Sequence, residues 1–169
     1  WVCSGQSNME MPVKGFGNQP VENSIDYIMR GGEEASRIRM FTVQRARSYD
    51  KDMEDCAGGQ WECASPASVA NCSATAYFFA YNLTHAVNIP IGVIATDWGG
   101  TRVESWMPLS ALKYCVNEEQ FKKKQTVHDI KPSELYCAMI APIRNFTARG
   151  FLWYQGEANL GDIDHYDKM

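Results

Sequence analysis

The feature that most constrains the fold is an uninterrupted apolar run, Ile89-Pro-Ile-Gly-Val-Ile-Ala95. Its apolar residues do not alternate with polar ones, which is typical of a strand buried on both faces of a parallel sheet. The preceding segment, Ser73 to Val87, repeats apolar residues at helical spacing and should end before Pro90. A helix followed directly by a doubly buried strand predicts an α/β fold, with helices covering both faces of a mainly parallel sheet.

The remaining segments fit this architecture. Further strands are expected at residues 1–3, 37–43 and 151–154, and further helices at residues 23–29 and from about 109. Residues 45–70 are polar and show no periodicity, so surface loops are expected there, with a short hairpin around Gly58-Gly59 as an option. We interpret residues 1–169 as a single domain that is truncated at both ends, because it starts within a strand and ends without a closing element.

The composition argues against several classes of function. With 169 residues, 45% of them hydrophobic, the chain can form a packed core. A net charge of −4 disfavours nucleic acid as the main partner. No apolar run approaches the length of a membrane span. The cysteines form no Cys-x-x-Cys pair, and no other cluster indicates a metal site, so neither a metal nor an organic cofactor is expected.

The cysteines and the glycosylation motifs indicate a compartment. Six cysteines are present, and Asn-x-Ser/Thr acceptors occur at Asn71, Asn82 and Asn145. Together they favour a secreted or lysosomal protein with some disulfides. Six cysteines allow 15 full pairings, of which the local pair Cys56–Cys63 is the most plausible, whereas Cys3 in the first strand is expected to be a buried free thiol.

Three of the expected strands end in similar polar turns, namely Gly5-Gln-Ser-Asn8, Trp98-Gly-Gly-Thr101 and Gln155-Gly-Glu157. In a parallel sheet such turns lie at one edge, where α/β proteins bind ligands. Ser7 is a candidate nucleophile there. Its backbone N–H, those of Gly99 and Gly100, and the side-chain amide of Gln155 could converge on an oxyanion. Glycine allows the backbone to approach a substrate closely.

These motifs resemble a known family. Gly5-Gln-Ser-Asn-Met9, Asp97-Trp-Gly-Gly-Thr101 and Trp153-Tyr-Gln-Gly-Glu-Ala-Asn159 are similar to motifs of the sialate O-acetylesterases, members of the wider SGNH (GDSL-like) hydrolases. The resemblance runs over nearly the whole chain. It implies a three-layer α/β/α sandwich, flavodoxin-like, whose C-terminal part is missing here. It also implies a serine esterase that removes O-acetyl groups from sialic acids, such as 9-O-acetyl sialate.

The resemblance also implies roles for individual residues. Ser7 matches the nucleophile, and Gly100 (or Gly99) matches the glycine of the oxyanion hole. Gln155 stands where related enzymes place a third donor, while Asn8 and Glu157 are expected to support the site or contact the sugar.

A serine nucleophile needs a general base, itself oriented by a third group. His85 lies within the expected helix and His128 follows a lysine cluster, so both are expected at the surface. Asp162-Ile-Asp-His165 has the Asp-x-x-His spacing of the family, but it follows the third turn too closely, and we interpret it as a chance match. The histidine and aspartate of the resembling enzymes are therefore expected beyond Met169, and the chain alone should show little turnover.

Two alternatives stay open. One keeps the chemistry and changes the substrate to another acetylated glycan such as acetylxylan. The other is a non-catalytic carbohydrate-binding domain, since Trp98, Trp106, Trp153 and Tyr154 lie near the turns and aromatic rings stack on sugars. For Trp153, which lies within a strand, packing under the turn is the preferred interpretation.

Overall fold

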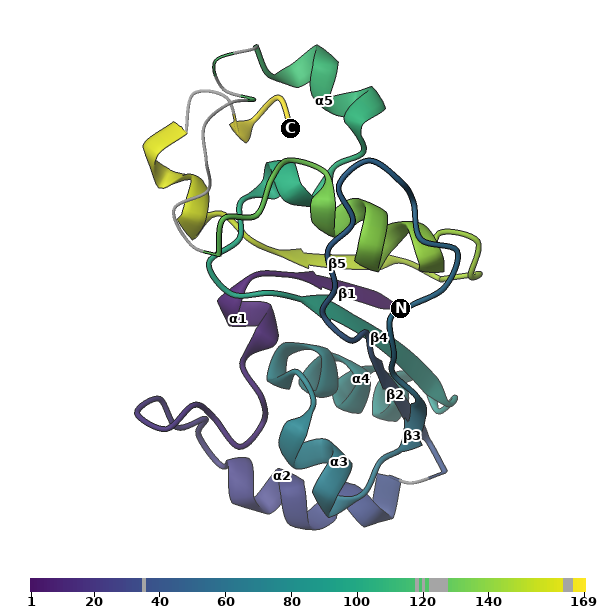
Figure 1. Ribbon diagram of the computed structural model, residues 1–169. Coiled ribbons are helices and arrows are strands. Elements are labelled where there is room, and N and C mark those ends of the chain that lie inside the picture. The colour runs from purple at the N-terminus through teal and green to yellow at the C-terminus, as the bar shows by residue number, and fades with distance from the viewer. Residues whose placement is uncertain (35, 118, 120, 122–127, 163–165) are drawn as a thin grey trace.

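The computed structural model describes residues 1–34, 36–117, 119, 121, 128–162 and 166–169. In this part of the chain five strands form one sheet in the order β3-β2-β4-β1-β5 (Figure 1). The strands are β1 (Val2–Gly5), β2 (Ile38–Thr42), β3 (Trp61–Cys63), β4 (Ile91–Asp97) and β5 (Phe151–Tyr154). All neighbouring pairs are parallel except β2–β3. The mainly parallel α/β sheet predicted from the sequence is therefore confirmed.

Helices of different lengths connect these strands. The α-helices are α1 (Ser7–Glu10), α2 (Ser24–Arg30), α3 (Pro66–Asn71), α4 (Ala74–Val87) and α5 (Leu109–Cys115). Shorter 3-10 segments are η1 (Gly31–Glu34), η2 (Val103–Trp106), η4 (Ala141–Ile143) and η5 (Glu157–Asp162), and η3 (Tyr136–Ile140) is a π-helical turn. The expected helices at residues 23–29, 73–87 and from 109 correspond to α2, α4 and α5.

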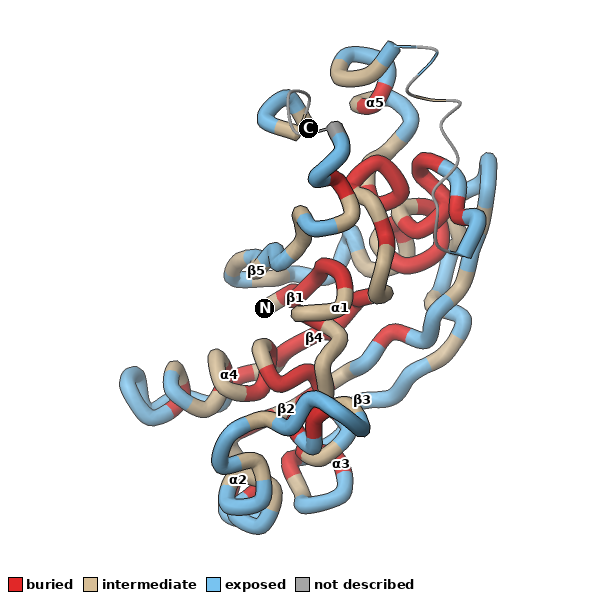
Figure 2. Tube along the Cα trace, turned by 90° about the vertical axis from the view of Figure 1, so that its left-hand side faces the viewer, coloured by how far each residue is buried: buried red, intermediate tan, exposed pale blue. Residues whose placement is uncertain are grey.

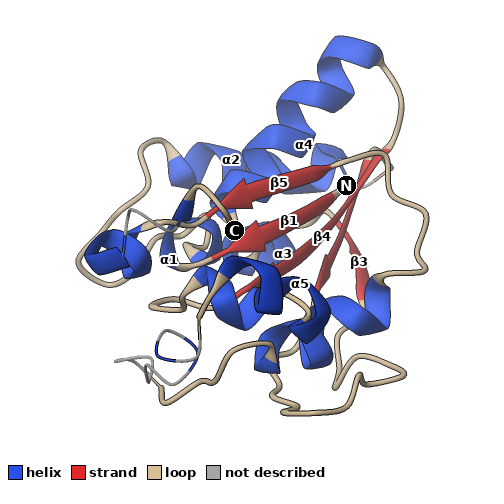
Figure 3. Ribbon diagram, turned by 90° about the horizontal axis from the view of Figure 1, so that it is seen from above, coloured by secondary structure: helices blue, strands red, loops and turns tan. Residues whose placement is uncertain are grey.

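The sheet lies between two apolar cores, because neighbouring residues of its strands point to opposite faces. Cys3 and Val93 face a core that includes residues of α3 and α4. Val2 and Ile94 face a second core formed with η2 and η3. Figures 1 and 3 show helices on both sides of the sheet, and Figure 2 shows that β1 and β4 are buried along their length.

The segment expected to consist of surface loops contains ordered structure instead. Residues 61–63 form β3, which pairs antiparallel with β2, and no hairpin forms around Gly58-Gly59. Helix α3 follows and begins with a capping box, in which Ser65 and Ser68 exchange side-chain and backbone hydrogen bonds and Pro66 takes the first helical position. This start signal is local in the sequence, but the helix is too short to show periodicity.

The cysteine predictions had mixed outcomes. Cys3 is a buried free thiol, as predicted, and burial raises its pKa to about 11. The predicted Cys56–Cys63 disulfide is wrong for this structure, in which all six cysteines are free. The physical reason is placement: Cys56 packs against the core that contains Val2, whereas Cys63 is exposed in β3.

Candidate functional site

The three turns lie side by side at the carboxyl edge of the sheet. Strand β1 pairs in parallel with both β4 and β5, and Gly5 stands opposite Asp97 on one side and Tyr154 on the other. The residues that follow each strand therefore leave the sheet at the same level. This confirms that the three motifs share one edge, and Figure 3 shows β4, β1 and β5 running in one direction.

Ser7 is the first residue of the one-turn helix α1 and opens onto a pocket of about 360 Å³. The pocket is lined by Ser7, Glu10, Phe16, Arg45, Trp98, Gly99, Gly100 and His128. The half-buried Ser7 makes no side-chain hydrogen bond to the part of the chain that the structure describes. Its hydroxyl is thus available to a molecule in the pocket.

The two glycines after β4 lie against this serine and differ in what their N–H groups do. A Cβ on Gly99 would stand 3.4 Å from the Ser7 Cβ, which is an ordinary contact distance, but only 2.7 Å from Glu10 Oε2. The Gly99 N–H donates to the Glu10 Oε2 at 2.5 Å. Gly100 has φ +73°, in the left-handed region that favours glycine, and its N–H has no acceptor among the described residues. Of the two glycine donors, that of Gly100 is the unoccupied one.

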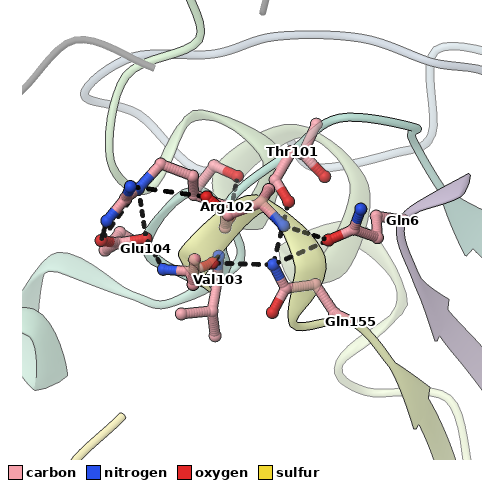
Figure 4. Close-up of polar contacts among 9 residues, drawn as sticks. Gln6, Thr101, Arg102, Val103, Glu104 and Gln155 are labelled. Atoms are coloured by element: carbon pink, nitrogen blue, oxygen red, sulfur yellow. Dashed lines mark hydrogen bonds and ion pairs between the residues drawn. The ribbon is translucent and has the colours of Figure 1, made fainter. Parts of the chain in front are cut away.

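Gln155 lies at the same edge of the sheet, but its side-chain amide, which was expected to face an oxyanion, is bonded within the protein. Its Nε2 donates to Gln6 Oε1 at 3.1 Å, Thr101 O at 3.0 Å and Asn159 Oδ1 at 2.8 Å. Three acceptors from three segments surround one amide (Figure 4). Gln155 therefore holds the turns together in this structure, and its service as an oxyanion donor stays a prediction.

The orientations of the three amides follow from backbone donors. Gln6 Oε1 accepts from the N–H groups of Gly156 and Ala158, at 3.4 and 3.1 Å. Asn159 Oδ1 accepts from the Val103 N–H at 3.0 Å. Since both oxygens face fixed donors, the nitrogen of Gln155 must be the atom directed at them. The Oε1 atom of Gln155 is buried and has no hydrogen-bond partner in the described part of the chain.

The network continues into an ion pair. Asn159, only 1% exposed, donates from Nδ2 to Glu104 Oε2 at 3.0 Å, and Glu104 pairs with Arg102 at 2.8 Å. Gln6 and Asn159 were not predicted as site residues, although both stand inside the motifs. A buried amide pair is recognisable only when its partners are known, because the sequence does not distinguish it from surface polar residues.

The rim of the site contains Asn8 and Glu157. The Asn8 Nδ2 donates to the Glu157 Oε1 at 2.5 Å, which joins the first and third motifs directly. Both side chains are solvent-accessible. They lie where the sequence placed them, and their contact with a substrate stays a prediction.

A charged cluster supports the second motif. Arg45 Nη2 pairs with Glu10 Oε1 at 2.7 Å and lies 3.7 Å from Asp97 Oδ1. Burial raises the pKa of Asp97 from 3.8 to about 7; Arg45 opposes this shift and Glu10 adds to it. Such perturbed acids gather at functional sites, although structural ion pairs produce them as well.

The three histidines considered as the general base differ in their positions. His85 is exposed on α4, with its Nε2 3.3 Å from Glu34 Oε1, as expected for a surface residue. His128 is also exposed, but it lines the Ser7 pocket, and its ring centroid is 5.8 Å from that of Trp98. The sequence did not reveal this second property. His165 lies outside the described residues, as do the two residues before it.

The aromatic residues near the turns are divided between packing and exposure. Trp106 is buried, and its Nε1 donates to Thr101 Oγ1 at 2.9 Å. The ring of Trp153 lies edge-on to that of Trp106, with 6.2 Å between the ring centroids, but 45% of the residue's surface is exposed. The packing expected for Trp153 is therefore only partial. Tyr154 is 47% exposed, and Trp98 lines the Ser7 pocket. Trp153 and Tyr154 are uncovered because β5 is an edge strand of the described sheet.

The glycosylation acceptors are all at the surface. Asn71, Asn82 and Asn145 are exposed, as an acceptor must be. In the described part of the chain, no helix has the length and apolar character needed to cross a bilayer, and no group of three or more His, Cys, Asp or Glu residues could hold a metal ion.

The fold and the site define a class: an α/β protein in which a half-buried serine at a pocket and a glycine turn meet at the carboxyl edge of a mainly parallel sheet. The model of a carbohydrate esterase family, the sialic acid-specific acetylesterases, matches residues 1–168, and the chain belongs to this family.

Similar proteins agree with this assignment. The human sialate O-acetylesterase is 32% identical over 171 residues, which cover 95% of this chain and 31% of that protein. The mouse sialate O-acetylesterase is 27% identical over 194 residues, covering 94% and 35%. The crystal structure of a carbohydrate acetylesterase from Xanthomonas citri superposes with a TM-score of 0.78 at 30% identity, covering 94% of this chain and 32% of that one. The chain thus spans about a third of the length of these relatives.

Proposed function

We propose that this protein is a serine esterase that removes acetyl groups from sugar hydroxyls, with O-acetylated sialic acid as the substrate. The observation that carries the proposal is the arrangement of Ser7 and Gly100. The Ser7 hydroxyl lies at a pocket beside a glycine turn, and neither this hydroxyl nor the Gly100 N–H has a hydrogen-bond partner among the residues that the structure describes. The relatives named sialate O-acetylesterase and the shared family support this chemistry. The proposal includes a three-layer SGNH-type sandwich as the fold of the whole enzyme, which the helices on both sides of the sheet support.

In the proposed reaction Ser7 Oγ attacks the carbonyl carbon of the acetyl ester. The carbonyl oxygen becomes an oxyanion, which the N–H groups of Ser7 and Gly100 would receive, since neither has an acceptor among the described residues. The sugar hydroxyl leaves with a proton, and water then hydrolyses the acetyl-serine to acetate. Preorganised donors of this kind are typically worth about 10²–10³ in rate each.

The proton of Ser7 must pass to a base. Three sources are compared: His128, which lines the same pocket, His165, whose Asp-x-x-His spacing we interpret as a chance match, and a histidine outside these 169 residues, as predicted from the sequence. Substituting His128 and His165 by Ala separately distinguishes them. Retention of acetyl release in both variants would support a base outside these 169 residues.

The test uses the protein at its full natural length. Acetate release from a 9-O-acetyl sialoside and from acetylxylan is measured for the wild type and for Ser7→Ala, together with covalent labelling by a fluorophosphonate. We expect release from the sialoside and labelling, both abolished by Ser7→Ala. Preferential release of acetate from acetylxylan would support the esterase activity but identify acetylxylan, and not the sialoside, as the preferred substrate. Glycan binding without labelling or release would establish a binding domain and refute the proposal.

The proposal includes a secreted or lysosomal location. Three exposed glycosylation acceptors support it. Sensitivity of the expressed protein to an N-glycosidase tests it.

A further inference from the structure

Glu10 joins the segment that carries Ser7 to the glycine turn after β4. It is the last residue of α1, the helix that Ser7 begins. One carboxylate oxygen, Oε2, accepts from the Gly99 N–H at 2.5 Å, and the other, Oε1, pairs with Arg45 Nη2 at 2.7 Å. Each oxygen therefore has its own partner, and the two partners come from different parts of the chain.

The contact at Gly99 is close enough to fix the turn. A Cβ on Gly99 would lie 2.7 Å from Glu10 Oε2, which is shorter than real Cβ contacts allow. The carboxylate occupies the space that any other side chain at position 99 would need. It also takes the Gly99 N–H, whereas the next donor in the chain, the Gly100 N–H, has no acceptor among the described residues.

Arg45 fixes the carboxylate in turn. Its Nε donates to the Asp97 carbonyl oxygen at 3.2 Å, and its guanidinium carbon lies 5.6 Å from the centroid of the Trp98 ring. Arg45 thus binds the backbone just before Gly99 while its Nη2 holds Glu10. The Glu10 side chain is 22% exposed, so this charge-assisted pair is partly shielded from water.

We propose that Glu10 is a positioning residue for the esterase reaction: its carboxylate holds the Gly99-Gly100 turn against Ser7, so that the Ser7 and Gly100 N–H groups face one oxyanion. The proposal rests on the proposed function. Glu10 itself neither attacks the ester nor transfers a proton. Its effect is on the placement of donors, where a displacement of about 1 Å can cost about 10²-fold in rate.

Three substitutions separate positioning from a purely structural role. Glu10→Gln keeps an oxygen that can accept from Gly99 at the same reach. Glu10→Asp keeps the charge but shortens the side chain by one methylene. Glu10→Ala removes both the accepting oxygen and the charge. Glu22→Ala serves as the matched control, because Glu22 is an exposed glutamate in the loop before α2.

The measurement is acetate release by the full-length protein, with kcat and KM determined separately. We expect kcat to fall about 10²-fold in Glu10→Ala and Glu10→Asp, with KM changed less than about threefold, because substrate binding does not need the oxyanion donors. Glu10→Gln should recover kcat to within about tenfold of the wild type. Glu22→Ala should match the wild type.

The results that would overturn the inference are distinct from those that overturn the function. A folded Glu10→Ala with wild-type kcat, beside an inactive Ser7→Ala, refutes only the role of Glu10. If Glu10→Ala does not fold, the kcat values of Glu10→Gln and Glu10→Asp are compared in its place. An active Glu10→Asp variant beside an inactive Glu10→Gln variant would refute positioning through Gly99. A wild type without acetyl release or Ser7 labelling refutes the proposed function and this inference together.

Discussion

The buried carboxyl group of Asp97 makes a pH-dependent contribution to stability that can be calculated from its surroundings. Asp97 ends β4, is 8% exposed, and has Arg45 Nη2 at 3.7 Å and Glu10 nearby. Burial is the largest cause of the rise of its pKa from 3.8 to about 7. The perturbation we propose is Asp97→Asn, which removes the titration and preserves the shape of the side chain.

The sign follows from proton linkage. Between the unfolded and the folded pKa, Asp97 is protonated in the folded protein and ionised in the unfolded chain, so the folded state binds more protons. Raising the pH therefore lowers the stability until the folded pKa has been passed. For a shift from 3.8 to about 7, this loss amounts to roughly 2–3 kcal/mol between pH 5 and pH 8.

The assay is urea unfolding followed by tryptophan fluorescence at pH 5 and pH 8, for the wild type and for Asp97→Asn. Other groups titrate equally in both proteins, so the difference between their unfolding free energies isolates Asp97. We expect Asp97→Asn to gain roughly 2–3 kcal/mol relative to the wild type from pH 5 to pH 8. An unchanged difference, or a relative gain by the wild type, would show that Arg45 holds Asp97 ionised and would refute the reasoning.

Two further substitutions test the geometry of the site. Gly99→Ala places a Cβ 2.7 Å from Glu10 Oε2, so the carboxylate must move away from the Gly99 N–H, and we expect a loss of about 1 kcal/mol in urea unfolding and about 10²-fold in the rate of acetate release. Gly17→Ala is its control, since no heavy atom lies within 4 Å of the added carbon, and equal losses in both variants would contradict the clash. Asn159→Ala leaves the buried Val103 N–H without its acceptor and removes one of several partners of Gln155 Nε2 and of Glu104 Oε2, so it should cost about 1–3 kcal/mol in the same unfolding assay. The exposed Asn145→Ala should change stability by less than about 0.5 kcal/mol, and a similarly small effect at Asn159 would show that the network is not stabilising.

Local sequence patterns were sufficient to predict an element where the order of its apolar and polar residues reflects how it is buried. The run at 89–95 lacks alternation because β4 is covered on both faces, and α4 shows the helical spacing of a helix packed on one side. They were insufficient for β3 and α3, which have three and six residues, too few to display a period. The side chain of Val87 fits the apolar stripe of α4 but is 47% exposed at the last residue of the helix.

The sequence by itself determined the parallel α/β sheet, the placement of three polar turns at one edge, and Ser7 as the candidate nucleophile. These follow from periodicity and from the fact that parallel strands end at the same level. Only the tertiary structure decided which donors are occupied: Glu10 takes the Gly99 N–H, and Gln6, Thr101 and Asn159 take the Gln155 amide. Hydrogen-bond partners distant in sequence depend on distances and angles between segments, and no local pattern of residues encodes these.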